Sequence, residues 1–212
     1  YWGGPTMTRI AIFCDGTWNS PDLDEPTSIH KLQGALLNDP SKGQVCAYFA
    51  GIGTDDRFDG SLKKFFNKWG GGIFGWGLDG KVKQAYQFLC QAYQPNDEIY
   101  LFGFSRGAYT ARSVAGMIRK CGIIDNPTPE RINEAFKLYR RKGTQNSPDK
   151  PHIMAERKRL SPRFATSVKD ADWRGGGAIV KIAYVGVFDT VGARGMPPSL
   201  LGPLATAWNS QY

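Results

Sequence analysis

The segment Ile99-Tyr-Leu-Phe-Gly-Phe-Ser-Arg-Gly-Ala-Tyr-Thr-Ala-Arg112 decides the fold class. An apolar run ends at Ser105 inside a G-x-S-x-G pattern, and a helical pattern follows from Gly107 to Lys120. A nucleophile elbow requires this order of strand, sharp turn and helix. We expect the small residues Gly103 and Gly107 to let a strained turn pass close to its neighbours, while Ser105 projects above the sheet. The competing interpretation of Ser105 is a helix-capping serine after a glycine turn.

Three further apolar runs have the composition of buried parallel strands, rich in β-branched and aromatic residues and closed by glycine or aspartate. They cover residues 9–14, 44–50 and 178–188. Helical patterns lie between the runs, over residues 27–37, 79–94, 107–120 and 128–143, with Asp79 and Thr128 as N-caps. This alternation predicts an α/β fold, namely an α/β-hydrolase-like, mostly parallel sheet with helices on both faces.

The length of 212 residues predicts a single domain over residues 1–212, because domains usually have about 100–200 residues. Met7 followed by Thr8 could be a natural start, in which case residues 1–6 are foreign to the protein. No apolar run approaches the roughly 20 residues of a membrane span, and the first residues lack the apolar core of a secretory signal. We therefore expect synthesis in the cytoplasm without a signal peptide.

The charge is unevenly distributed. The formal net charge is +8, and the segment from Arg131 to Arg174 holds twelve Lys and Arg against five Asp and Glu. Such a balance favours anionic partners such as a membrane surface, although a charge run is more often a solvated face. A nucleic-acid role rests on charge alone and is not expected. We interpret residues 140–175 as a basic cap insertion over the strand ends, and the glycine- and aromatic-rich residues 55–77 as a lid or a packed loop.

The four cysteines are widely spaced and form no C-x-x-C pair. This pattern indicates a reducing compartment, without structural disulfides or a zinc site. We expect neither a metal nor a cofactor.

A serine nucleophile needs backbone donors for the developing oxyanion. The amide of Arg106, directly after the serine, is one candidate. The second donor should come from the loop after a neighbouring strand, and Gly16 and Thr17 lie in such a loop. On sequence alone, an ordinary turn at Asp15-Gly16 competes with this interpretation.

The serine also needs a base and an acid that orients it. Asp189 closes the strand 178–188 and is the candidate acid, with a turn or capping role as its alternative. Hydrolases of this fold use the order Ser, acid, His, yet no histidine follows Asp189. Either the histidine lies beyond Tyr212, with the last part of the domain missing, or His30 or His152 is recruited. We favour the first of these interpretations.

Five motifs together resemble one family, a microbial and fungal α/β-hydrolase domain whose best-understood members are type VI secretion phospholipase effectors. The motifs lie at residues 13–19, 51–54, 74–79, 99–112 and 187–191. The resemblance covers about residues 9 to 200, and the run from Gly103 to Arg112 is far more specific than G-x-S-x-G. It implies a Ser-Asp-His esterase acting on lipid esters, with Ser105 as nucleophile and Asp189 as acid.

The expected function is therefore that of a lipase or phospholipase, with a lipid or other ester as substrate. The resemblance also implies delivery to a target-cell membrane or periplasm by a secretion system, with an immunity or secretion-apparatus protein as a partner. The alternative is a non-catalytic binding module that keeps the fold without turnover. A phosphatase-type D-x-D-G-T loop is excluded because Phe13 stands where the nucleophilic aspartate is needed.

Overall fold

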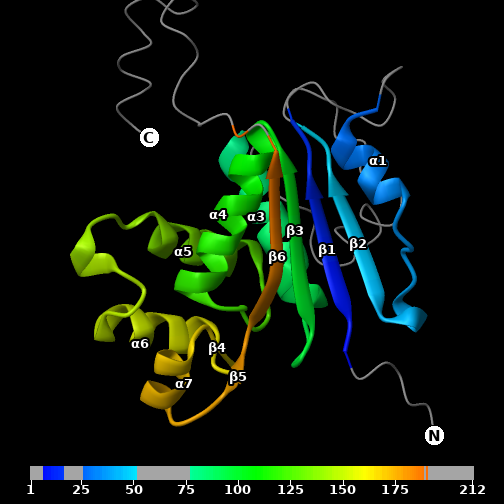
Figure 1. The fold of residues 1–212 in the computed structure, drawn as a ribbon. Coiled ribbons are helices and arrows are strands. Elements are labelled where there is room, and N and C mark those ends of the chain that lie inside the picture. Colours follow the sequence, from blue (N-terminus) through cyan, green and yellow to red (C-terminus); the bar gives the residue numbers. More distant parts are fainter. Residues whose placement is uncertain (1–6, 17–25, 52–76, 189, 191–212) are drawn as a thin grey trace, which may run out of the picture.

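Four parallel strands form the central sheet, in the order β2-β1-β3-β6 (Figure 1). The structure is a computed structural model that describes residues 7–16, 26–51, 77–188 and 190. The strands are β1 Arg9–Cys14, β2 Gln44–Phe49, β3 Glu98–Phe104 and β6 Lys181–Phe188. The predicted α/β class with a parallel central sheet is confirmed. Because all four strands run in one direction, their carboxyl ends meet at the upper edge of the sheet in Figure 1.

The helices lie on both faces of this sheet. In the described residues they are α1 Ser28–Gly34, α3 Leu78–Ala92, α4 Arg106–Cys121, α5 Pro129–Arg140, α6 Pro151–Leu160 and α7 Val168–Arg174, with short 3-10 turns η1 Pro40–Lys42 and η2 Thr144–Asn146. Successive residues of β1 point to opposite faces of the sheet. Ile10 and Ile12 belong to the larger core with α3 and α4, whereas Ala11 and Phe13 pack with Ile29 of α1.

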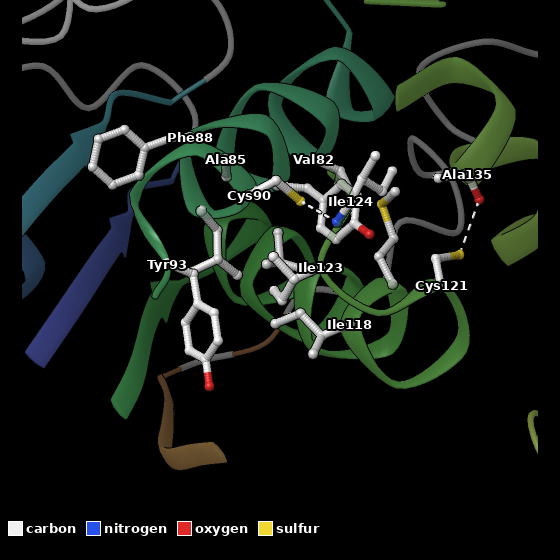
Figure 2. Close-up of a cluster of buried hydrophobic side chains, with 14 of the residues drawn as sticks. Val82, Ala85, Phe88, Cys90, Tyr93, Ile118, Cys121, Ile123, Ile124 and Ala135 are labelled. Carbon is white, nitrogen blue, oxygen red and sulfur yellow. Dashed lines mark hydrogen bonds between the residues drawn. The ribbon is translucent and has the colours of Figure 1, made fainter. Parts of the chain in front are cut away.

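The larger core lies between the sheet and helices α3, α4 and α5, and Figure 2 shows part of it. Its apolar side chains are almost fully buried, which supplies most of the free energy that stabilises the fold. Two thiols also make polar contacts inside it. The Ile124 amide donates to Cys90 Sγ at 3.4 Å, and the Cys121 thiol donates to the Ala135 carbonyl at 3.2 Å.

The α1 face is packed unevenly. Helix α1 contacts β1, β2 and β3, whereas β6 forms one edge of the described sheet. On that edge Tyr184 is 51% exposed and Phe188 is 45% exposed. The ring of Tyr184 still contacts Phe102, which stacks on the buried Phe13 at 4.9 Å between ring centroids.

Several element boundaries differ from the prediction. The run 178–188 is not one strand, because Ala178–Ile179 forms β5 in a separate two-stranded sheet with β4, Phe164–Ala165. The N-cap of α3 is Gly77, and Asp79 lies in the first turn of the helix instead. The Thr128 cap of α5 is confirmed, since its side chain accepts from the Arg131 amide, although the helix ends at Arg140 rather than near 143.

The expected cap over the strand ends is not confirmed. Residues 140–175 form η2, α6, β4 and α7, and they pack at the carboxyl end of α4 (Figure 1). The Arg157 guanidinium donates to the carbonyls of Arg119 and Lys120, which belong to the last turn of α4. Since α4 has 16 residues and rises about 1.5 Å per residue, this segment lies roughly 24 Å from the Ser105 end of the helix.

Candidate active site at the carboxyl edge of the sheet

Ser105 occupies a strained turn between β3 and α4. Its backbone angles are φ 53° and ψ −118°, in the positive-φ region that residues with a side chain rarely adopt. Two backbone hydrogen bonds hold this conformation: the Ser105 amide donates to the Phe188 carbonyl at 3.0 Å, and the Ala108 amide donates to the Ser105 carbonyl at 3.1 Å. Strain of this kind persists only where the surroundings impose it, and it concentrates at functional sites.

Two glycines make the turn sterically possible. A β-carbon on Gly103 would lie 2.4 Å from the Gly107 carbonyl oxygen, and one on Gly107 would lie 2.0 Å from the Cys14 carbonyl oxygen. Both distances are far below van der Waals contact. The first turn of α4 therefore rests directly on the backbone at the end of β1.

The end of β1 carries a buried carboxylate. Asp15 is 4% exposed, and its Oδ1 accepts from the Gly16 amide at 2.7 Å. Its Oδ2 accepts from the Tyr48 hydroxyl at 2.7 Å and from the Thr27 hydroxyl. Burial raises the pKa of Tyr48, and the hydrogen bond to Asp15 raises it further, so the phenol remains a neutral donor. Sequence reasoning missed this cluster, because Tyr48 and Thr27 reach Asp15 only through the tertiary fold.

The candidate oxyanion donors have different surroundings. Arg106 is the first residue of α4, and within the described residues no side chain caps this end of the helix. An uncapped amino end presents backbone N–H groups and a partial positive charge to an anion. The Gly16 amide, in contrast, is already used by Asp15. Thr17 lies outside the described residues.

A small pocket opens beside these groups at the carboxyl edge. Its lining combines the ends of β1 and β2 with the first turns of α3 and α4: Cys14, Asp15, Phe49, Ala50, Gly51, Leu78, Lys81, Arg106 and Thr110. Two of these residues are cationic, and desolvation lowers the pKa of Arg106. The pocket therefore offers apolar walls together with charged groups next to the Ser105 turn.

The structure brings together most of the predicted site residues. Ser105, Gly103, Gly107, Arg106 and Gly16 all lie at the carboxyl edge of the sheet, around the contact between α4 and the end of β1. Asp189, like Thr17, lies outside the described residues, as do residues 55–76 of the expected lid. Phe188, the last residue of β6, pairs with Phe104, which directly precedes Ser105.

The two histidines lie in different places. His30 is half-buried on α1, with its ring 5.4 Å from that of Tyr48 in an edge-on contact. His152 is exposed on α6, at the carboxyl end of α4. An approach of His152 to Ser105 would therefore have to cover roughly the length of α4.

Cysteine and metal chemistry find no support in the described part of the chain. All four cysteines are buried and unpaired. Burial raises the pKa of Cys14, Cys90 and Cys121 to about 12, so these thiols do not ionise near neutral pH. Among the described residues, no group of three or more His, Cys, Asp or Glu side chains is placed to hold a metal ion.

None of the helices described here is long and apolar enough to cross a membrane.

Comparison with known proteins shows which family this site belongs to. A phospholipase-type hydrolase domain is indicated, because the family model described as "T6SS, Phospholipase effector Tle1-like, catalytic domain" matches residues 8–210. The chain belongs to this family of catalytic domains from type VI secretion effectors.

One curated relative and the solved structures complete the comparison. The chain is similar to "Uncharacterized protein YEL023C" of Saccharomyces cerevisiae, with 32% identity over 203 residues. The match covers 92% of this chain but 28% of the yeast protein, so the chain spans somewhat more than a quarter of that relative's length. No solved structure matches the chain.

Proposed function

We propose that this domain hydrolyses carboxylic esters of lipids as a serine hydrolase, with Ser105 as the nucleophile. The observation that carries the proposal is the positive φ of Ser105 between β3 and α4. Glycines at 103 and 107 allow this turn where no β-carbon would fit. A nucleophile elbow has the same combination of strand, strained serine and helix. A helix-capping serine has no need of the strain.

The proposed reaction follows the general scheme of acyl transfer. Ser105 Oγ attacks the ester carbonyl carbon while a histidine takes its proton, and the carbonyl oxygen becomes an oxyanion. We propose the Arg106 amide as one donor to this oxyanion and the Thr17 amide as the second, because the Gly16 amide already donates to Asp15. The alcohol then leaves with the histidine's proton. Water attacks the acyl carbonyl while the histidine takes its proton, and Ser105 Oγ leaves with that proton as the carboxylic acid is released.

Asp189 is the proposed acid that orients the histidine. It follows Phe188, whose carbonyl accepts from the Ser105 amide, and this neighbourhood supports the assignment. In an experimental structure, its carboxylate and Ser105 Oγ should lie roughly 6–9 Å apart, leaving room for an imidazole. Neither His30 nor His152 is proposed as the base. The expectation of a histidine beyond Tyr212 remains a proposal.

The experiment is replacement of Ser105 by alanine in the natural full-length protein. We expect turnover of a lipid ester to fall about 10⁴–10⁶-fold with little change in the melting temperature. Ser113→Ala serves as the control, because Ser113 is a buried serine on the same helix. A Ser105→Ala protein that keeps more than a tenth of the wild-type turnover contradicts the proposal.

Membership of the effector family supports two further proposals. The protein would be delivered to the membrane or periplasm of a target cell, and an immunity protein would block it in the producing cell. The basic segment 131–174 supports an anionic membrane surface as a partner, although several of its arginines are already paired with carboxylates. A non-catalytic module would keep these partners and show no turnover.

A further inference from the structure

We infer that Asp15 is a positioning residue for the reaction at Ser105, acting through a clamp that consists of Asp15, Tyr48, Thr27 and the Gly16 amide. The inference rests on the proposed function and adds to it a residue that no step of the reaction uses. A buried carboxylate is costly unless several donors satisfy it. Here the donors come from different elements of the fold.

The clamp ties two elements, β2 and α1, to the end of β1. Tyr48 is on β2, Thr27 is the N-cap of α1, and Gly16 follows Asp15 directly. Thr27 thereby has two roles, since its hydroxyl also accepts from the His30 amide at 3.1 Å. In addition, the Asp15 amide donates to the Phe49 carbonyl at 3.0 Å, which extends the ladder between β1 and β2 past the strand end.

The link from the clamp to Ser105 runs through Gly107. A β-carbon on Gly107 would lie 2.0 Å from the Cys14 carbonyl oxygen and 2.7 Å from that of Asp15. Backbone groups in such close contact cannot shift independently. A movement of the Asp15 backbone therefore moves the first turn of α4, which carries Ser105 at its start.

The clamp also sets the direction of the Gly16 amide. As long as Asp15 Oδ1 accepts from this amide, the short loop segment Asp15-Gly16 after β1 is held in one conformation. A misplacement of about 1 Å in a catalytic group can cost roughly 100-fold in rate, so loosening this loop should slow the chemical step more than it weakens substrate binding.

The test compares two tyrosine-to-phenylalanine variants of the natural full-length protein. Tyr48→Phe removes one donor to Asp15. Tyr86→Phe is the matched control, because the buried Tyr86 hydroxyl donates to the Gly122 carbonyl at 2.7 Å, in the core and away from the clamp. The measurements are kcat and KM with p-nitrophenyl butyrate, the melting temperature, and hydrogen exchange of the peptide that contains Gly16.

We expect Tyr48→Phe to lower kcat about tenfold, with KM within about twofold, and to speed exchange at the Gly16 peptide. Tyr86→Phe should lower the melting temperature to a similar degree while leaving kcat and that exchange unchanged. The inference is overturned if both variants lower kcat equally, or if Tyr48→Phe leaves kcat at the wild-type value. Failure of the proposed function is recognised separately, because Ser105→Ala would then retain turnover, whereas exchange at Gly16 reports on the clamp without any reaction.

Discussion

The amino end of α4 carries a strained serine pressed against neighbouring backbone, whereas its carboxyl end is enclosed by buried hydrogen bonds and ion pairs. At the amino end, Ser105 has positive φ and no side-chain cap satisfies the first turn. At the carboxyl end, the Gly122 amide donates to the Ile118 carbonyl at 2.9 Å, and Arg157 donates to the next two carbonyls. One helix thus has an open amino end, without a side-chain cap, and a closed carboxyl end.

The closed end depends on a fully buried triad. Arg157 and Asp170 are both 0% exposed, and the Arg157 Nε donates to Asp170 Oδ2 at 3.0 Å. Arg174 lies 3.1 Å from the same carboxylate. Substitutions at the two ends of α4 should therefore have different main consequences. At the amino end we expect mainly a loss of activity, and at the carboxyl end mainly a loss of stability.

Among substitutions that leave Ser105 in place, Gly107→Ala should have the largest effect on activity. The new β-carbon would press on the Cys14 carbonyl and displace the Ser105 turn, so we expect turnover to fall at least about 100-fold. The free energy of unfolding should fall by about 1–3 kcal/mol. In the control Gly34→Ala, the β-carbon meets no described atom within 4 Å, and turnover should not change. Equal behaviour of the two variants, measured by ester hydrolysis, would refute the close contact.

Arg157→Met tests the closed end. Removal of Arg157 leaves the buried Asp170 paired with Arg174 alone, and the last turn of α4 loses its buried guanidinium donor, so the free energy of unfolding should fall by about 3–5 kcal/mol. Where the variant still folds, kcat should match the wild type. Arg159→Met on the same helix is the control, since Arg159 pairs with Glu134 at the surface and its loss should cost less than about 1 kcal/mol. Chemical denaturation measures both, and similar losses would contradict the account.

The acid sensitivity of the closed end follows from Asp170. Burial alone would raise the pKa of Asp170, but hydrogen bonds from Arg157 and the Thr166 amide, with the charges of Arg157 and Arg174, outweigh it and lower the pKa. The triad's contribution is therefore complete above the unfolded value of about 3.9 and is lost as pH falls through the lower folded value.

Melting temperatures between pH 6 and pH 3 measure this dependence. The wild type should lose stability at the acid end, and Asp170→Asn should flatten part of the curve. Asp172→Asn, an exposed position on the same helix, should keep the wild-type slope. A slope unaffected by Asp170→Asn would show that the triad is not responsible.

Asp149→Asn should have the smallest effect. Asp149 pairs with Arg119 at 2.7 Å, but both side chains are more than a third exposed. We expect a loss below about 1 kcal/mol that shrinks further in salt. A loss as large as that of Arg157→Met would contradict the distinction between buried and exposed pairs.

Local patterns in the sequence predicted the strands and the serine turn well. β1 has the predicted bounds, and β3 ends directly before Ser105 as predicted, because short apolar runs closed by turn residues leave few alternatives. A β-carbon at Gly103 or Gly107 would clash with neighbouring backbone, which agrees with the small residues expected there, while their role in a nucleophile elbow stays a prediction. The family was also recognised from its motifs, and the match over residues 8–210 confirms it.

Contacts between distant segments were not predictable in the same way. The basic segment was expected above the site, whereas its helix α6 contacts the carboxyl end of α4. The sequence alone does not show at which end of a helix an insertion packs. The Asp15 clamp was missed because its members are spread from residue 15 to residue 48. Val180 separates β5 from β6 through a hydrogen bond to the Ala165 carbonyl, a tertiary contact inside an uninterrupted apolar run.

The most direct test of the central claim is covalent labelling of the natural full-length protein with a fluorophosphonate probe, followed by mass spectrometry of the peptides. The probe's phosphorus forms a bond to an activated serine oxygen and fluoride leaves, so only a working nucleophile reacts quickly. The account predicts a label on Ser105 in the wild type and none in Ser105→Ala, with loss of ester hydrolysis in proportion to labelling. An active protein whose label lies on another serine, or that remains unlabelled at Ser105, would contradict it.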